Sequence, residues 1–286
     1  MKVLPFKIPK PQSEALVYQE DHEMIFYDQL HQHEEIQISY IASGSGSLIV
    51  GDSINDFKKG DILVIGENTP HVFRSDKNAS SQSLMITLFF TRKSFGDDFF
   101  NIRDLSELQL FFEESWYGMK ILSDKERLIP LFQKLKPLNK IERIAALLEI
   151  LNMILQSKKV RLSSFVYKKK YTNAEGKRMN NVFHYAMDHF DQAITLNEIA
   201  QEANMSKNAF CRYFKKRTNK TFFQFLIEIR IEHACKLLYK SDELSISAIS
   251  ELCGFQNIAN FNRKFKELKN MTPSQYRKKF QKQVHQ

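Results

Sequence analysis

A short basic segment near the end of the chain carries side chains that could read the edges of DNA bases. In GFQNIANFNRKFKELKNMTP (254–273), four residues fall at i, i+3, i+4 and i+7 and so share one helix face: Ala259, Asn262, Arg263 and Lys266. Arginine can bind guanine O6 and N7 with two hydrogen bonds, asparagine can pair with adenine, and alanine can touch a thymine methyl group. Taken alone, the segment is equally typical of an ordinary solvated helix.

An internal repeat supplies a second copy of this face. TLNEIAQEANMSKNAFCRYFKKRTNKT, from Thr195, aligns with SISAISELCGFQNIANFNRKFKELKNMT, from Ser245. The first polar face (Asn208, Cys211, Arg212 and Lys215) matches the second polar face (Ala259, Asn262, Arg263 and Lys266). A solvated face has no reason to keep Arg and Lys at equivalent positions in both copies, whereas a face that enters a major groove does. The repeat therefore favours DNA contact over a merely solvated face.

Each copy has the pattern of a helix-turn-helix unit, at about 195–217 and 245–268. Between the copies, TFFQFLIEIRIEHACKLLYKS (221–241) contains no Pro or Gly and keeps apolar residues at helical spacing, which predicts a connecting helix. A rigid connector could hold two recognition helices about one DNA turn, roughly 34 Å, apart.

Residues from about 178 to 282 resemble the DNA-binding domain of the AraC/XylS family of bacterial transcription regulators. The resemblance rests on LNEIAQEANMSKNAFCRYFKK, IRIEHACKLL, SISAISELCGFQNIANFNRKFK and MTPSQYR. It implies a seven-helix domain whose two units bind adjacent major grooves of double-stranded DNA. The base-contacting positions of the family correspond here to Asn208, Cys211, Arg212, Ile258, Ala259, Asn262 and Arg263. Ser206, Lys207, Lys215, Asn257 and Lys266 complete the predicted DNA-binding set, the lysines being placed for phosphate.

One departure from the family concerns the ends of the recognition helices. Many members carry Gly where Asn219 and Asn270 stand in this chain. Asparagine tolerates the left-handed conformation that such a helix end requires, so we expect both C-caps to persist.

A second group of polar residues could bind a small ligand or a metal ion. The segment HQHEEIQISYIASGSGSLIVGDSINDFKKGDILVIGENTPHVF (31–73) resembles the cupin-type sensor domain common in the same family. Metal-binding cupins use His-x-His, a Glu and a later His. His31, His33 and His71 are present, but the Glu position is best matched by Gln37, which is a poor transition-metal ligand.

We therefore predict an effector-binding site that includes His31, His33, Gln37 and His71, with no metal and no other cofactor. Glu34 or Glu35 could substitute for the missing carboxylate, which keeps a metal site open as an alternative. In a third interpretation, the histidines only make hydrogen bonds to the backbone and turns of a barrel.

The elements that would position these histidines show two different periods. Ile36, Ile38 and Tyr40 alternate with polar residues, as expected for half-buried strands, and Gly-rich turns separate several such runs. These strands predict a small barrel or sandwich at about 20–95. Residues 104–156 then change to helical spacing. One wide apolar face in IERIAALLEILNMIL (141–155) either packs on the barrel or forms a dimer seam: Ile141, Ile144, Ala145, Leu148, Leu151 and Leu155.

Charge is unevenly distributed along the 286 residues. Residues 1–156 hold 17 Lys and Arg against 22 Asp and Glu, residues 157–178 hold 8 against 1, and residues 179–286 hold 17 against 10. Only the basic back half is thus expected to meet a polyanion. The chain has no long apolar run and no secretory signal pattern, and its three cysteines are too few for a disulfide framework, so a reducing cytoplasm is expected.

These observations predict an α+β chain of two domains. Residues 1–156 form a cupin-like effector-sensing and dimerisation domain, 157–177 a basic linker, and 178–286 an all-α DNA-binding domain with two helix-turn-helix units. The predicted function is a sequence-specific transcription regulator, controlled by a small-molecule effector in the barrel. It would act as a homodimer on nucleoid DNA, contact RNA polymerase if it is an activator, and have no membrane partner and no catalytic residues. A cupin metalloenzyme with an appended DNA-binding module and a non-specific architectural DNA binder are the alternatives.

Overall fold

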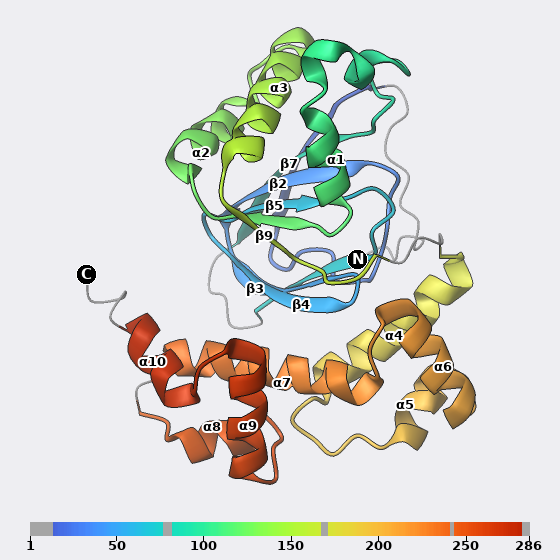
Figure 1. The fold of residues 1–286 in the computed structure, drawn as a ribbon, viewed down its shortest axis with the longest axis vertical. Helices are drawn as coiled ribbons and strands as arrows, with labels where there is room; N and C mark the ends of the chain where they lie inside the picture. Colours follow the sequence, from blue (N-terminus) through green and yellow to red (C-terminus); the bar gives the residue numbers. More distant parts are fainter. Residues whose placement is uncertain (1–13, 77–81, 167–170, 241–242, 282–286) are drawn as a thin grey trace. The chain divides into compact units, whose positions relative to one another are not determined.

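The structure is a computed structural model that describes residues 14–76, 82–166, 171–240 and 243–281. The chain divides into two compact units between Gly176 and Lys177 (Figure 1). The first combines strands and helices and the second contains only helices in its described residues, which confirms the predicted α+β class. Within these ranges, no helix is both long and apolar enough to cross a membrane.

Two antiparallel sheets form the centre of the first unit. The larger has the strand order β1-β7-β2-β5-β8-β9 and the smaller the order β4-β3-β6. The strands of the larger sheet are β1 (Val17–Glu23), β2 (Ile36–Ser43), β5 (Ile62–Ile65), β7 (Ser83–Phe90), β8 (Met119–Ile121) and β9 (Lys159–Arg161). Those of the smaller sheet are β3 (Ser45–Val50), β4 (Ser53–Lys58) and β6 (His71–Ser75).

Helices cover the outer face of the larger sheet, as Figure 1 shows for α1 (Leu108–Ser115), α2 (Lys125–Lys134) and α3 (Lys140–Gln156). Ile36, Ile38 and Tyr40 of β2 pack into the same buried cluster as these helices. The opposite face of β2 carries Ile41, which packs with the smaller sheet. The sequence predicts half-buried strands, but β2 is buried on both faces because each face has a covering layer. Its polar residues Gln37 and Ser39 are therefore interior.

Helix α3 buries a different face from the one that the sequence predicts. Leu147, Ile150, Leu151 and Ile154 are fully buried in the first unit, whereas Ile141 is 80% exposed. The apolar residues in the second half of α3 are therefore explained by packing within the first unit. The apolar face that the sequence predicts lies at the edge of the buried face, and its first residue, Ile141, is exposed.

Part of the predicted linker 157–177 is instead a strand. Lys159 and Arg161 of β9 pair with Ile121 and Met119 of β8 at the end of the larger sheet. The sequence obscures this strand because its flanking residues are basic and its central Val160 is outward and exposed. Residues 167–170 of the predicted linker lie outside the described residues, and helix α4 begins at Asn173, earlier than the predicted domain start at 178.

The second unit has seven helices in its described residues, as the family resemblance implies. They are α4 (Asn173–Asp188), α5 (Leu196–Glu202), α6 (Lys207–Thr218), α7 (Phe222–Lys240), α8 (Ile246–Leu252), α9 (Ile258–Lys269) and α10 (Pro273–Gln281). Helices α5–α6 and α8–α9 are the two helix-turn-helix units, and α7 is the predicted connecting helix.

Residues in the left-handed backbone conformation end the helices of both helix-turn-helix units. Asn204 (φ 50°) and Gly254 (φ 74°) make the turns, while Asn219 (φ 54°) and Asn270 (φ 55°) end α6 and α9. The backbone N–H groups of Asn219 and Asn270 donate to the carbonyls of Lys215 and Lys266. The structure confirms that asparagine serves as the C-cap where many family members carry Gly.

Aromatic side chains fix the recognition helices α6 and α9 to the rest of the unit. Phe210 and Phe214 of α6 are fully buried against Phe222 and Phe225 of α7. In the second copy, Phe261 and Phe265 belong to the buried cluster around α9. The sequence places Leu268 on the same apolar face, but it is 39% exposed because that cluster ends at Phe265 along α9.

Candidate nucleic-acid interface and histidine cluster

The structure places every predicted DNA-binding residue on the exposed surface of α6, α9 or the turn before them. These residues are Ser206, Lys207, Asn208, Cys211, Arg212, Lys215, Asn257, Ile258, Ala259, Asn262, Arg263 and Lys266. The phenylalanines that fix both helices point the other way, into the core. Both polar faces are thus presented by rigid helices and are open to a partner.

Two of the predicted residues also cap the recognition helices. Ser206 Oγ accepts a hydrogen bond from the backbone N–H of Ala209, and Asn257 Oδ1 accepts from the N–H of Ala259 at 2.8 Å. Their acceptor oxygens are therefore used within the helix start. The Ser206 hydroxyl hydrogen and the Asn257 amide hydrogens are the groups that suit a phosphate contact.

The two copies differ in how they hold the equivalent arginines. Arg263 Nη2 donates to Asn260 Oδ1 at 2.8 Å, and Arg263 Nη1 lies 3.9 Å from Glu267 Oε2. The first copy has Ala209 and Lys216 at the corresponding positions. Side chains of its own helix thus orient the guanidinium of the second copy, and the first copy lacks those two side chains.

In the first unit, His31, His33 and His71 form a compact group, here called the histidine cluster. The backbone N–H groups of His31 and His71 donate to each other's carbonyls at 3.0 and 2.9 Å, which joins the segment before β2 to the start of β6. The ring centroids of His31 and His71 are 4.3 Å apart, and those of His33 and His71 are 5.1 Å apart. All three residues are buried.

Backbone carbonyls orient each ring of the histidine cluster in the same sense. The Nδ1 atoms of His31, His33 and His71 lie 2.9, 2.8 and 2.9 Å from the carbonyl oxygens of residues 29, 35 and 69. Because a carbonyl only accepts, each Nδ1 carries the hydrogen, which leaves the lone pair of the neutral ring on Nε2. One nitrogen from each ring can be chosen so that the three lie within 4.8 Å of one another.

Gln37, the fourth predicted residue, lies beside the cluster. Its Oε1 is 3.1 Å from His33 Nε2, and its Nε2 donates to Ser39 Oγ at 2.8 Å, which in turn lies 2.8 Å from Thr87 Oγ1. Glu34 is exposed, and the Glu35 carboxylate lies on the Nδ1 side of His33, at 3.8 Å. Neither glutamate therefore replaces Gln37. The sequence predicts no metal; the three imidazoles are a donor group that could hold a transition-metal ion, whereas the amide oxygen of Gln37 is a poor ligand for one.

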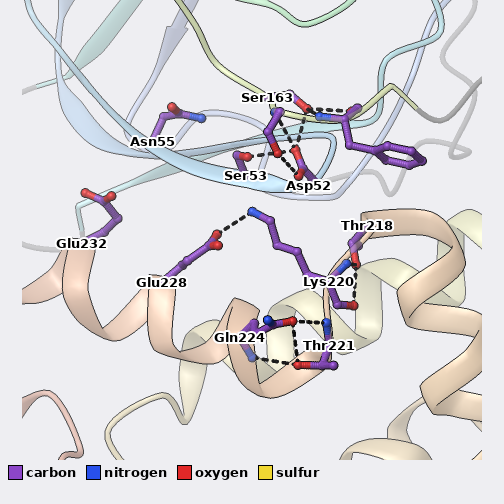
Figure 2. Close-up of polar contacts among 12 residues, drawn as sticks. Asp52, Ser53, Asn55, Ser163, Thr218, Lys220, Thr221, Gln224, Glu228 and Glu232 are labelled. Atoms are coloured by element: carbon purple, nitrogen blue, oxygen red, sulfur yellow. Dashed lines mark hydrogen bonds and ion pairs between the residues drawn. The ribbon is translucent and has the colours of Figure 1, made fainter. Parts of the chain in front are cut away.

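A buried carboxylate joins the smaller sheet to the segment that leaves the first unit (Figure 2). Asp52, only 1% exposed, accepts hydrogen bonds from Ser163 Oγ at 2.7 Å, Ser164 N at 3.0 Å and Ser164 Oγ at 2.6 Å. We call this contact the Asp52 clasp. It lies close to the histidine cluster along the sheet, since Gly51 N–H donates to the Pro70 carbonyl at 2.9 Å. Sequence reasoning missed the clasp because nothing local connects residues more than a hundred positions apart.

The sequence matches two domain models. Residues 23–87 match a cupin domain and residues 199–279 match a helix-turn-helix domain. The uncharacterised HTH-type transcriptional regulator YdeC of Bacillus subtilis is 25% identical over 88% of this chain and 87% of its own length. The Msm operon regulatory protein of Streptococcus mutans is 23% identical over 85% of this chain and 84% of its own length. Among solved structures, ToxT from Vibrio cholerae is 14% identical and covers 92% of this chain and 97% of its own, with a TM-score of 0.36.

A cupin domain followed by paired helix-turn-helix units, with exposed basic faces in both copies, defines a two-domain DNA-binding transcription regulator. The chain therefore combines a cupin domain with an AraC-type helix-turn-helix domain, and the two relatives that match most of its length are both named as regulatory proteins.

Proposed function

We propose that the chain recognises a specific operator as a homodimer, with α6 and α9 of each copy in adjacent major grooves. The observation that carries this proposal is the duplicated exposed face, which keeps Arg and Lys at equivalent positions of both recognition helices. An arginine in the middle of the exposed face of a recognition helix suits guanine, and a lysine one turn later suits phosphate.

The predicted residues divide into two roles. Base contacts fall to Asn208, Cys211, Arg212, Ile258, Ala259, Asn262 and Arg263. Phosphate contacts fall to Ser206, Lys207, Lys215, Asn257 and Lys266. Each copy offers one asparagine and one arginine for hydrogen bonds to bases, and the second copy adds apolar contact through Ile258 and Ala259.

The first unit is proposed to receive a small-molecule effector at the histidine cluster and to form the dimer. Burial of three histidines and Gln37 in the interior supports a ligand site, since polar groups of this kind are seldom collected in a core without a use. The exposed apolar start of α3, at Ile141, supports a contact with a second copy. We propose that the protein acts on the nucleoid in the cytoplasm, without catalytic turnover, and contacts RNA polymerase if it activates transcription.

Selection of bound sequences from random DNA, with the full-length protein, tests this function. We expect each subunit to select two conserved blocks about 10 base pairs apart, because one DNA turn separates the two recognition helices. A specific site should bind roughly 10³–10⁷ times more tightly than random DNA. Equal competition by random DNA would instead identify a non-specific architectural protein. Repeating the selection with a metabolite library identifies the effector by a change in affinity.

A further inference from the structure

Helix α7 joins the two copies of the helix-turn-helix, and each half of it packs on a different copy (Figure 1). Phe222 and Phe225 of its first half contact Phe214 of α6. Ile231 and Leu238 of its second half belong to the buried cluster around α9. In the described part of the chain, α5 and α6 share no extensive contact with α8 and α9. The relative placement of the two recognition helices therefore depends on α7 and on whatever braces its middle.

Arg230, in the middle of α7, holds the segment that leads into the first copy. Its Nε donates to the carbonyl oxygen of Phe190 at 2.7 Å, and its Nη2 donates to that of Gln192 at 2.8 Å. These residues lie between α4 and α5, and we call 190–192 the bridging segment. The ring of Phe190 also lies 4.6 Å from the ring of His233 in α7. Because the N–H donors of a guanidinium form a rigid plane, Arg230 fixes both the position and the direction of the bridging segment.

The bridging segment also lies against the turn of the second copy. A β-carbon at Gly254 would be 2.7 Å from the carbonyl oxygen of Asp191 and 2.8 Å from that of Phe190, so any larger residue would push the two segments apart. The equivalent turn residue of the first copy, Asn204, has the same left-handed conformation and is exposed. The repeat thus carries glycine in its second copy because the backbone of the bridging segment approaches that turn.

Arg230 extends this contact towards the second recognition helix. The central carbon of its guanidinium lies 5.7 Å from the ring centroid of Phe255, the residue after Gly254. The ring of Phe255 lies 5.1 Å from that of Phe261 in α9, and both rings are buried. A continuous path of contacts therefore joins the segment that leads into α5 to the core of α9.

We propose that Arg230 and Gly254 are positioning residues that fix the distance and rotation between α6 and α9, and with them the spacing of the two operator blocks that one chain accepts. A single helix can bend along its length, whereas a second connection through the bridging segment makes the two copies move as one body. Each base pair added between two blocks of DNA shifts one block by about 3.4 Å and rotates it by about 35°. Two recognition helices in a fixed relation should therefore discriminate between spacings.

This inference rests on the proposed function, because it assumes that each chain binds two operator blocks. One of its two experiments is made without DNA. Failure of the operator selection therefore leaves that experiment unaffected, and a negative result in it leaves specific DNA recognition unaffected.

The first experiment measures the relation between the two recognition helices directly. Cys211 of α6 is exposed, whereas Cys235 and Cys253 are buried. Asn262→Cys adds a thiol at the equivalent position of α9, so spin labels can be attached to both recognition helices of the full-length chain. Double electron–electron resonance then gives the distribution of distances between the labels. Dilution with unlabelled chain removes the contribution of label pairs on different chains.

Two variants break the brace in different ways. Arg230→Met removes the donors to the bridging segment and keeps most of the apolar stem. Gly254→Asn keeps the turn, since Asn204 adopts the same conformation, but its side chain would collide with the backbone of the bridging segment.

Arg277→Met is the matched control. Arg277 Nη2 donates to the carbonyl oxygen of Leu244 at 2.7 Å, which is the same kind of contact as those of Arg230. This bond joins α10 to the residues before α8, so it does not link the two copies. Its loss should lower stability without moving α6 relative to α9.

We expect a narrow distance distribution in the parent chain and in Arg277→Met, and a broader one in Arg230→Met and Gly254→Asn. The second experiment measures DNA affinity without labels, on operators with one base pair inserted or removed between the blocks. The wild-type chain should lose about 5–150-fold in affinity at the altered spacings, the usual range for two coupled binding events. Arg230→Met and Gly254→Asn should lower this spacing penalty at least about threefold and leave affinity for a single block unchanged.

A purely structural role would give a different result. A variant that only reduced the amount of folded protein would weaken binding to every site by the same factor and keep the wild-type spacing penalty. Circular dichroism measures the folded fraction of each variant. A distance distribution as narrow in both variants as in the parent chain would overturn the proposal. A broad distribution in the parent chain, or a spacing penalty that both folded variants leave unchanged, would do the same.

Discussion

Replacing the arginine or the lysine on the polar face of α6 should weaken DNA binding in two different ways. Arg212→Ala should lose about 1–3 kcal/mol on the selected site and relax the preference at one or two base pairs, because it removes a base contact. Lys215→Ala should weaken all sequences alike and reduce the salt dependence by about one unit of slope, because it removes a phosphate contact. Binding titrations at several salt concentrations, on specific and random DNA, measure both effects.

The equivalent change in the second copy, Arg263→Ala, removes a guanidinium that Asn260 and Glu267 hold along the helix, and it distinguishes a base contact from a backbone contact. If Arg263 contacts a base, the affected base pairs should lie about 10 away from those of Arg212. Equal weakening on every sequence would mean that the second copy only anchors the protein to the DNA backbone.

Cysteine reactivity offers an independent test of the first polar face. Cys211 is exposed on α6, whereas Cys235 and Cys253 are buried, and burial raises the pKa of the Cys253 thiol to about 12. Since the thiolate is the reactive form, maleimide should label Cys211 first. Operator DNA should slow this labelling, which mass spectrometry can follow, and Cys211→Ser should abolish it. A labelling rate that DNA leaves unchanged would place Cys211 outside the groove.

At the scale of elements, the Asp52 clasp should contribute measurably to the stability of the first unit. Asp52→Ala leaves the backbone N–H and the hydroxyl of Ser164 without their acceptor, whereas the Ser163 hydroxyl keeps the carbonyl of Phe165. We expect a loss of about 1.5–3 kcal/mol in the free energy of unfolding, as for hydrogen bonds to a charged group.

Asp56→Ala is the matched control in urea unfolding experiments. Its carboxylate is 59% exposed and shares Lys120 with the buried Asp61, so its loss should change stability by less than about 0.5 kcal/mol. A similar loss of unfolding free energy in both variants would show that the Asp52 clasp stabilises the unit no more than an exposed ion pair does.

Local signals in the sequence predicted the helical elements well. The second unit follows from its repeat, because Phe210 and Phe261 recur at matched positions and capping residues such as Ser206 and Asn257 mark the helix starts. Asn219 and Asn270 were predictable for the same reason, since a left-handed cap depends on one residue and its neighbours.

Features that depend on distant contacts were not predictable. The burial of Gln37 and Ser39 depends on layers supplied by other strands and helices, and β9 exists because β8 lies beside it. The histidine cluster was predicted as a group from family resemblance, but the direction of each ring depends on backbone carbonyls that the sequence does not place.

At the scale of the whole molecule, the two units should contribute separately to affinity. A fragment of residues 171–286, which keeps α4 intact, has its own core and should bind operator DNA more weakly than the full chain. If a second copy binds through α3, the gain from linking two DNA-binding units is about 10²–10⁴-fold.

Ile141→Lys in the full chain tests the dimer contact directly. It adds a charge to a side chain that is already exposed, so the fold should persist while affinity falls towards that of the fragment. Ultracentrifugation and DNA titration measure the two effects, and Lys140→Ala, a neighbouring exposed substitution, serves as the control. A full chain that is monomeric yet binds more tightly than the fragment would contradict the dimer.

The position of the Asp52 clasp has a consequence for genetics. Gly51 is in the left-handed conformation (φ 56°), and a β-carbon there would lie 2.8 Å from Ser163 Oγ, so even alanine would disturb the clasp. The same turn is bonded to the residue before His71, and Ser163 and Ser164 precede the DNA-binding unit in the chain. If the effector acts through this turn, alleles that switch a reporter on permanently should accumulate at Gly51, Asp52 and Ser164, none of which belongs to the histidine cluster or to either polar face.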